Sequence, residues 1–349
     1  MGSGTYGNVL LASKRDDPKT QVALKRLQLP SCNNGDERMR MERFAKREMW
    51  ALKELGGHPN IVHLLGVFRD AQDNVYMAMP LAAHDLSGLL ACQQATHMPA
   101  GQLKGYVFQL FQAIAYCHER GVMHRDIKAE NVLIMSDNVV KLADFGLARE
   151  MQLNYDRYTS PVQTLWGRSP ELLLGFTAYD ERSDVWAAVC VLLQCLLRKP
   201  LLPGQDEKDQ LVLIYKLCGT PQNVARDWPP ALVTPIQKSL HLVRGPLPKA
   251  IRARLGPEQV IWRRDLFTPG LLDVAERGLE LNPVKRSSMK ELLDMPYFTQ
   301  EYPRPYSTEQ MIVYPEGQRT SRVLFDQGKP QRGETRKRPH HHHHHHHHK

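Results

Sequence analysis

Short strand-like runs of apolar residues around one helical run make up the first 80 or so residues of the chain. Residues 8–12, 21–27, 61–69 and 74–79 are predicted strands, and residues 37–55 have the apolar spacing of a helix. Further along, the spacing predicts helices at residues 102–120, 183–197, 206–217, 270–281 and 287–293. The pattern predicts an α+β fold, with a small β-rich lobe (residues 1–79) joined by a hinge (80–85) to a larger α-helical lobe (86–298).

The end of the chain has a different composition. Residues 299–339 are rich in Pro, Gln, Arg and Gly, which predicts a flexible basic tail. The polyhistidine stretch at residues 340–349, nine histidines followed by Lys349, is interpreted as an expression tag, with a natural metal-binding tract as the alternative. The tail supplies +4 of the formal charge of +9, and the remaining +5 is spread over some 300 residues. This mild bias predicts no direct nucleic-acid binding.

Composition also indicates the cellular setting. The hydrophobic fraction of 42% is ample for a core, and the six cysteines show no CxxC pair or disulfide spacing, which predicts reduced thiols. The longest apolar run, residues 185–197, is shorter than the roughly 20 residues that a membrane span needs. We expect a soluble intracellular protein, nuclear or cytoplasmic, with the nucleus favoured. The basic run at residues 336–338 has the composition of a short nuclear-import signal, but three basic residues in a tail are usually just solvated.

Gly2, Gly4 and Gly7 form a GxGxxG run at the start of the chain. Glycine lets backbone amides approach phosphate oxygens because no Cβ intervenes. The run by itself indicates little, since it often marks a flexible turn and in dinucleotide-binding folds it opens a helix. Here Val9 and Leu10 continue as a strand, which favours a phosphate-covering loop between strands.

Lys25 lies in the predicted strand of residues 21–27, where a buried cation can hold the α- and β-phosphates of a nucleotide. A lysine on a strand is usually solvated. Its interpretation changes because Glu48 lies in the helix that follows and can pair with it across the lobe.

The run HRDIKAEN at residues 124–131 is followed, after a short predicted strand, by DFG at residues 144–146. Phosphoryl transfer needs a carboxylate near the attacking hydroxyl, which Asp126 supplies, and Lys128 can steady the transferring phosphate. It also needs Mg²⁺, for which Asn131 and Asp144 offer oxygen ligands. Chance does not account for both motifs at this spacing, downstream of the glycine run.

On these motifs, residues 1–298 resemble the protein kinase superfamily. The resemblance implies a bilobal protein kinase domain that transfers the γ-phosphate of ATP, with Mg²⁺, to serine or threonine, since Lys128 is typical of serine/threonine kinases. Glu171 lies in SPE, where the family has APE, and Arg286 is its implied buried partner. Asp184 matches the aspartate that supports the catalytic loop.

The same resemblance implies a set of residues around ATP, with Met79 beside the adenine and Pro80 and Ala82 in the hinge. Pro80 keeps the backbone carbonyl that accepts from the adenine amine, and Ala82 supplies the amide donor. The implied ATP-binding residues are Gly2, Gly4, Gly7, Val9, Ala23, Lys25, Met79, Pro80, Ala82, Leu133 and Asp144.

Within the superfamily the chain resembles the cyclin-dependent kinases. AKREMWALKEL at residues 45–55 is similar to their cyclin-binding helix, and residues 158–175 are similar to their activation segment. HDLSGLL at residues 84–90 is most similar to the transcription-elongation members. The resemblance implies a cyclin bound to the helix that contains Glu48 and Ser/Thr-Pro protein substrates, with the C-terminal repeat of RNA polymerase II as the candidate.

Thr159 matches the threonine whose phosphorylation activates this group. A phosphate adds roughly 1.5 to 2 negative charges and needs arginines to receive it. Arg47, Arg125 and Arg149 stand at the matching positions in three different segments. We therefore expect a phosphate socket and an activating kinase as a second partner.

The sequence departs from the family in several places. Most of the first strand is missing before the glycine run, which suggests a truncated sequence. Val162 and Arg168 match positions that shape the family's proline pocket, and Thr164 matches the threonine that bonds the catalytic aspartate. Gly167, however, replaces a tyrosine, which puts the proline preference in question, and Val189 replaces a glycine for which the sequence offers no physical reason.

Three functions remain open at this point. The first is an active cyclin-dependent serine/threonine kinase, for which every required group is present. The second is a pseudokinase that serves as a cyclin-binding scaffold, supported by the short first strand, Gly167 and Val189. The third places the function in the basic, histidine-rich tail, as a binder of metal or nucleic acid.

Overall fold

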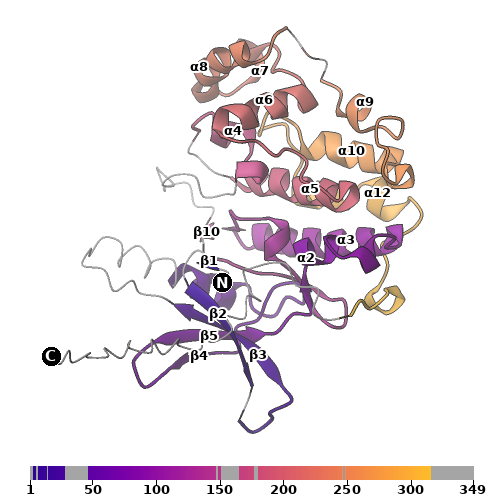
Figure 1. Cartoon of the computed structure of the whole chain (residues 1–349). Coiled ribbons are helices and arrows are strands. Elements are labelled where there is room, and N and C mark those ends of the chain that lie inside the picture. Colours follow the sequence, from indigo (N-terminus) through magenta and orange to yellow (C-terminus); the bar gives the residue numbers. More distant parts are fainter. Residues whose placement is uncertain are drawn as a thin grey trace, which may run out of the picture.

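The computed structural model describes residues 3–4, 7–13, 15–27, 46–146, 148–150, 165–176, 180–245, 247 and 249–315. A small strand-rich lobe lies at one end of the molecule and a larger helical lobe at the other (Figure 1). The predicted α+β bilobal fold is confirmed.

The small lobe is a five-stranded antiparallel sheet in the order β1-β2-β3-β5-β4. Its strands are β1 (Ser3–Gly4), β2 (Gly7–Ser13), β3 (Gln21–Leu27), β4 (Gly66–Arg69) and β5 (Val75–Pro80). Residues 46–54 are helical and bury Glu48, Ala51 and Leu52, with Leu55 following on the same side. This i, i+3, i+4, i+7 spacing places one stripe of the helix against the lobe.

The predicted strand of residues 61–69 is wrong for its first half, because only Gly66–Arg69 is a strand. Ile61 instead forms an isolated bridge to Leu142, and the Val62 amide donates to the Leu142 carbonyl at 3.0 Å. The apolar residues at the start of this run therefore reflect burial against the large lobe and not membership of the sheet.

The large lobe is built around two long helices, α3 (Ala100–Glu119) and α5 (Glu181–Leu197). Nearly all of α5 is buried, which explains why it reads as a continuous apolar run in the sequence. The other helices are α2 (Leu86–Leu90), α4 (Pro170–Leu173), α6 (Glu207–Cys218), α7 (Val224–Asp227), α8 (Pro230–Ser239), α9 (Ile251–Leu255), α10 (Pro269–Gly278), α11 (Met289–Leu293) and α12 (Pro296–Thr299).

Short strands and single helical turns lie at the junction of the lobes. The strands β6 (His84–Asp85), β8 (Val132–Ile134) and β9 (Val140–Leu142) form a three-stranded sheet, and β7 (Val122–Met123) pairs with β10 (Arg149–Glu150). The 3₁₀ turns η2 (Ala129–Asn131) and η3 (Leu165–Gly167) carry parts of the predicted catalytic loop and activation segment.

Val189, which had no explanation from the sequence, faces Gly278 where α5 crosses α10. A Cβ built on Gly278 would overlap the Val189 side chain, which is fully buried. The valine therefore occupies the space that the glycine leaves free, and the two positions act as one packing unit.

Ordered packing continues past residue 298, so the prediction of a flexible tail from residue 299 is wrong for residues 299–315. The Tyr306 amide donates to the Gly101 carbonyl at 2.9 Å, in the room left by the glycine on α3. The Ile312 amide and carbonyl both bond the Gln102 side chain, at 2.8 and 2.9 Å. The rest of the predicted tail, with the histidines, lies outside the described residues.

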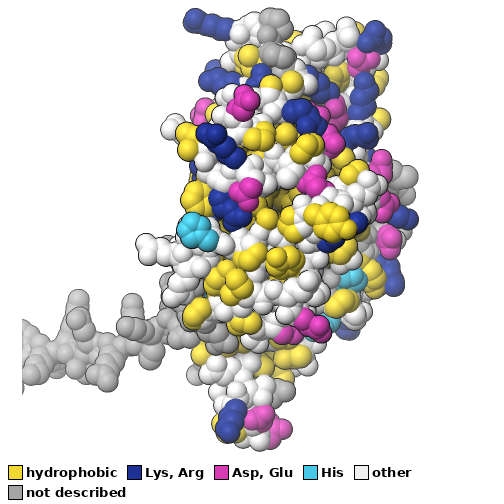
Figure 2. All heavy atoms as spheres, turned by 90° about the vertical axis from the view of Figure 1, so that its right-hand side faces the viewer, with side chains coloured by type: hydrophobic (Ala, Val, Ile, Leu, Met, Phe, Trp, Pro, Cys, Tyr) yellow, Lys and Arg dark blue, Asp and Glu magenta, His cyan; other side chains and the backbone are white. Residues whose placement is uncertain are grey.

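Several compositional expectations can be compared with the described part of the chain. No described helix has the length and apolar character that crossing a membrane requires. Five of the six cysteines are buried free thiols, as predicted, while Cys32 is not described. On the face shown in Figure 2, basic and acidic side chains are interspersed.

The contact between Val189 and Gly278 yields a stability test. Gly278→Ala overpacks the crossing and should lower the free energy of unfolding by about 1–3 kcal/mol. Val189→Ala alone should lower it by about 1–2 kcal/mol through the cavity it leaves. In the double variant the new methyl group enters that cavity, so urea unfolding should show a smaller loss than the two single losses added together. Strict additivity would contradict the proposed contact.

Candidate active site

Lys25 lies at the centre of the small-lobe site, on β3 opposite Met77 of β5. Its ammonium donates to both carboxylate oxygens of Glu48, at 3.2 and 3.0 Å, and lies 3.6 Å from Asp144 Oδ1. All three side chains are buried. The predicted pair of Lys25 and Glu48 is thus formed, and the DFG aspartate joins it.

Burial works against both charges of this pair. Burial lowers the pKa of Lys25, although the nearby charge of Asp144 opposes the change. Burial likewise raises the pKa of Glu48, and the negative charge of Asp144 adds to that rise. One cation between two buried carboxylates leaves an excess of negative charge, which a bound cation would neutralise.

The catalytic loop positions Asp126 through its neighbours. Asn131 Nδ2 donates to the Asp126 carbonyl at 2.7 Å and to Asp126 Oδ2 at 3.3 Å, and Lys128 Nζ lies 3.7 Å from the same Oδ2. The Asp126 amide donates to His124 Nδ1 at 3.1 Å, so His124 Nε2 carries the proton and donates to the Ala143 carbonyl at 2.8 Å. The predicted residues Asp126, Lys128 and Asn131 therefore form one connected group.

Burial raises the pKa of Asp126 to about 7, with Lys128 opposing and Asp144 adding to the rise. A carboxylate that titrates near neutral pH can accept a proton from a hydroxyl in the transition state more readily than one with an ordinary pKa. A carboxylate with this pKa would be suited to act as a general base at neutral pH.

Asp184, on α5, supports the loop from within the large lobe. Its carboxylate accepts from the backbone amides of His124 at 2.9 Å and Arg125 at 3.0 Å, and it bonds His118 Nε2 at 2.9 Å. Arg125 has a φ of 75°, a left-handed conformation that costs about 1–3 kcal/mol for a non-glycine residue. The two hydrogen bonds that Asp184 accepts from these amides stabilise that conformation. His118 was not predicted, because a single histidine on a helix carries no motif.

Asp144 also adopts a left-handed backbone, with a φ of 59°. The amide of Gly146 lies 3.4 Å from its Oδ1, and the ring of the buried Phe145 packs edge-on against His124 at 4.7 Å between centroids. The Ala143 amide donates to the Asn131 carbonyl at 2.9 Å. These contacts hold the DFG segment against the catalytic loop.

The residues fit Mg²⁺. The Asn131 side chain donates to Asp126 through its Nδ2. Its Oδ1 is buried and has no hydrogen-bond partner among the residues that the structure describes. A buried, unsatisfied oxygen is costly unless a ligand completes it. Together with the Asp144 carboxylate it offers the oxygen donors that Mg²⁺ prefers. Asn131 and Asp144 are the residues that would hold the ion.

The residues predicted around the nucleotide lie where the lobes meet. Gly4 pairs with Gly7 across the β1–β2 hairpin, so the glycine run joins two strands and does not open a helix. Ala23 on β3 pairs with Met79 on β5. These two side chains are buried, as are Ala82 and Leu133, whereas Pro80 is half-buried. Gly2 and the side chain of Val9 lie outside the described residues.

Glu171 and Arg286 form a buried bidentate ion pair in the large lobe, with N···O distances of 2.7 and 2.9 Å. Arg286 also donates to the carbonyls of Glu280 and Arg182, each at 2.9 Å, and its guanidinium lies over the Trp186 ring. The geometry matches the pairing that the sequence resemblance implied, and it anchors the SPE segment to the helical core.

The predicted regulatory site is described only in part. Thr159, and with it Val162 and Thr164, lies outside the described residues, as does the side chain of Arg149. Arg125 is buried beside the catalytic loop and Arg47 is half-buried on the helix of residues 46–54. Arg168, the residue after η3, is buried and donates to Glu207 at the start of α6 at 2.9 Å, a contact that was not predicted.

A bilobal fold with a lysine–glutamate pair, a buried aspartate base and an oxygen-lined metal position defines a phosphoryl-transfer site. Residues 1–298 match the family described as "Protein kinase domain". The chain belongs to the protein kinase family.

Three relatives illustrate the similarity. The CTD kinase subunit alpha of Schizosaccharomyces pombe is 37% identical over 306 residues, which cover 87% of this chain and 48% of that protein. Cyclin-dependent kinase C-2 of Arabidopsis thaliana is 35% identical over 330 residues, covering 90% and 60%. A chain in the structure of the CAK complex from Chaetomium thermophilum bound to ATP-gamma-S is 34% identical, with a TM-score of 0.76 and coverage of 89% and 92%. The chain spans about half the length of the curated relatives it matches, and the predicted resemblance to cyclin-dependent kinases is confirmed.

The role of Asp184 can be tested through the pH dependence of stability. Burial, the largest single effect, would raise its pKa, but the combined effects of His118, His124 and the Arg125 amide outweigh burial, and the pKa is lowered. Its contribution to stability is therefore present above about pH 4 and is lost as pH falls through the folded-state pKa. Asp184→Asn should lower the free energy of unfolding at pH 7 by about 3 kcal/mol and flatten its decline in acid.

Denaturant unfolding between pH 3 and pH 7 measures both effects. Asp273→Asn, on the exposed surface of α10 beside Arg252, is a matched control and should cost at most about 1 kcal/mol. An Asp184→Asn protein as stable at pH 7 as that control would contradict the supporting role of Asp184.

Proposed function

We propose that this protein is a cyclin-dependent serine/threonine kinase that transfers the γ-phosphate of ATP to protein substrates. The observation that carries the proposal is the buried contact of Lys25 with Glu48 at 3.0 Å and with Asp144 at 3.6 Å. It joins three elements from both lobes around the position where phosphates are held. A merely structural ion pair would not require the second carboxylate beside Lys25.

The residues divide the chemistry between them. Asp126 accepts the proton of the substrate hydroxyl as its oxygen attacks the γ-phosphorus and ADP leaves, and Lys128 places a positive charge beside the transferred group. Lys25, held by Glu48, orients the remaining phosphates. Mg²⁺, when bound by Asn131 and Asp144, neutralises phosphate charge.

The pseudokinase alternative finds no support. The six groups that the chemistry needs lie in one site: Lys25, Glu48, Asp126, Lys128, Asn131 and Asp144. Val189, one of the reasons for that alternative, is explained by its contact with Gly278. The tail alternative is not tested, because residues 316–349, with the histidine run, lie outside the described residues.

Cyclin dependence is supported by the position of Glu48. The glutamate that completes the site lies on the helix expected to bind a cyclin, so a partner on that helix would control whether the pair with Lys25 forms. Leu65, Val67 and Phe68, at β4 on the edge of the sheet, are about half exposed, an apolar surface suited to a protein partner. The names of two relatives, a cyclin-dependent kinase and a CTD kinase subunit, agree with this proposal.

We extend the proposal to regulation and substrate. Phosphorylation of Thr159 by a separate kinase would place a phosphate among Arg47, Arg125 and Arg149. Ser/Thr-Pro sites are the proposed substrate class, with the C-terminal repeat of RNA polymerase II as the first candidate and the nucleus as the compartment.

The test is transfer from ATP and Mg²⁺ to a Ser-Pro peptide library, with a co-expressed cyclin. Asp144→Asn removes a charge from the metal position and should reduce transfer by about 100-fold or more without unfolding the protein. Omitting the cyclin, or changing Thr159→Ala, should also lower the rate. A transfer rate that is unchanged in Asp144→Asn would contradict the assignment of the site. A transfer rate that is the same with and without the cyclin would contradict only the proposed cyclin dependence.

A further inference from the structure

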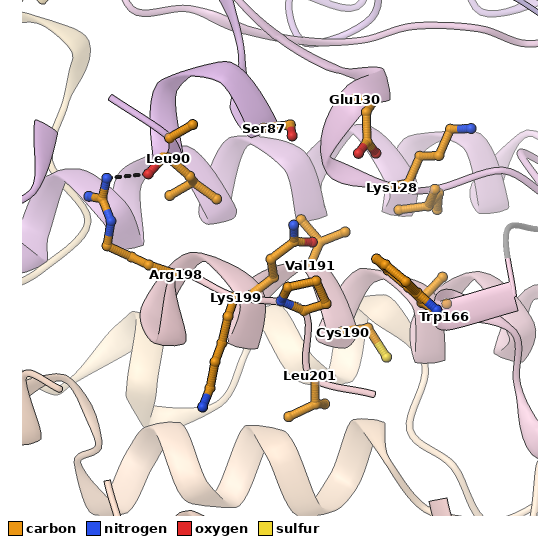
Figure 3. Close-up of a pocket in the computed structure, with 16 residues that line it drawn as sticks. Ser87, Leu90, Lys128, Glu130, Trp166, Cys190, Val191, Arg198, Lys199 and Leu201 are labelled. Atoms are coloured by element: carbon orange, nitrogen blue, oxygen red, sulfur yellow. Dashed lines mark hydrogen bonds between the residues drawn. The ribbon is translucent and has the colours of Figure 1, made fainter. Parts of the chain in front are cut away.

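A cavity of about 570 Å³ lies next to the catalytic loop, outside the group that performs the chemistry. Its walls come from α2, the catalytic loop, η3, α5 and the segment that follows α5 (Figure 3). The volume is in the range of pockets that hold small ligands or large side chains.

Gly167 is the reason that the cavity is open at η3. A Cβ built on this residue would lie 3.7 Å from the Ile127 carbonyl oxygen and 3.9 Å from the Ala187 Cβ, which is ordinary contact. Both neighbours line the cavity, so any side chain at position 167 would enter the space between them. The family resemblance implied a tyrosine at this position. Glycine has no side chain, so the space that the tyrosine ring would fill stays empty.

The walls favour an apolar occupant. Leu90, Val191 and Leu201 line the cavity from three different segments, and Trp166 forms one side of it (Figure 3). The Trp166 indole NH already donates to the Gly204 carbonyl at 2.8 Å, so the ring presents mainly apolar surface while remaining 45% exposed.

The charged residues that line the cavity are Lys128, Glu130, Arg198 and Lys199. The Arg198 guanidinium is turned to the carbonyls of Leu90, Cys92 and Ala95, as the dashed bond to Leu90 in Figure 3 shows. Glu130 lies on the catalytic-loop side of the cavity, near Lys128 (Figure 3). The apolar surface is thus bordered by charge where a peptide would enter.

The cavity borders the catalytic loop beside Asp126, the proposed base. Lys128 belongs to its wall and lies 3.7 Å from Asp126 Oδ2, the proposed base. An extended peptide advances about 3.3–3.6 Å per residue, so a residue within about three positions of the acceptor can reach the opening.

We propose that this cavity is a specificity subsite that takes a bulky apolar side chain, aromatic or long aliphatic, of the peptide substrate, and that Gly167 creates it. The proposal rests on the kinase activity proposed above and adds a determinant of sequence preference that acts beside the Ser/Thr-Pro motif.

A positional-scanning library around a fixed Ser-Pro acceptor tests the subsite. One position within about three residues of the acceptor should prefer Phe, Tyr, Trp, Leu or Met over Ala and Asp by about tenfold or more in kcat/KM. Gly167→Tyr fills the cavity and should abolish that preference, while Gly167→Ala should retain most of it because its methyl group fits without overlap.

Ser87 gives an independent way to fill the cavity, since it lines the α2 side, away from the acceptor segment. Ser87→Phe should weaken the same preference, and Ser87→Ala should leave it unchanged. This pair keeps the test decisive if Gly167→Tyr fails to fold, which thermal unfolding would reveal.

The outcomes separate the two proposals. Transfer to Ser-Pro peptides with no apolar preference at any position, or with a preference that survives both Gly167→Tyr and Ser87→Phe, overturns the subsite and leaves the kinase assignment intact. No transfer to any peptide, with cyclin bound and Thr159 phosphorylated, overturns both.

Discussion

The buried contact between Lys25, Glu48 and Asp144 is the interaction on which the rest of the site depends. It connects β3, the helix of residues 46–54 and the DFG segment, three elements that lie far apart in the sequence. Burial disfavours every charge in it, so removing any one of the three side chains would leave a buried charge without its compensation. Such a contact is suited to switching, because moving one helix removes the glutamate and leaves a buried lysine without its main partner.

The large lobe uses buried charge in a more rigid way. Asp184 fixes the backbone of His124 and Arg125, and the ion pair of Glu171 with Arg286 fixes the SPE segment against the same helical core. Both sets are anchored to α5 or to residues packed on it, and α5 is almost completely buried. The catalytic loop and the SPE segment are therefore both supported by one buried helix, whereas Lys25 and Glu48 come from the smaller lobe.

Sequence reasoning found the catalytic groups because short motifs carry their chemistry in fixed spacing: HRDIKAEN and DFG specify both residue types and order. It missed contacts that are fixed only in three dimensions. His118 bonds Asp184 across 66 positions, and Val189 fits against Gly278 on another helix, so neither leaves a local pattern. The packing of residues 299–315 was missed because prolines and polar residues outnumber the few anchors, of which Tyr306 is one. The helix α8 was not predicted because Pro235 lies inside it.

A double-mutant cycle on Lys25 and Glu48, read as kcat/KM for ATP in phosphate transfer, tests the central claim most directly. If the two residues act as one unit, Lys25→Met should lower kcat/KM by about 100-fold or more, Glu48→Gln by about tenfold or more, and the double variant no further than Lys25→Met alone. Losses that multiply in the double variant would show that the two residues act independently and would contradict the account.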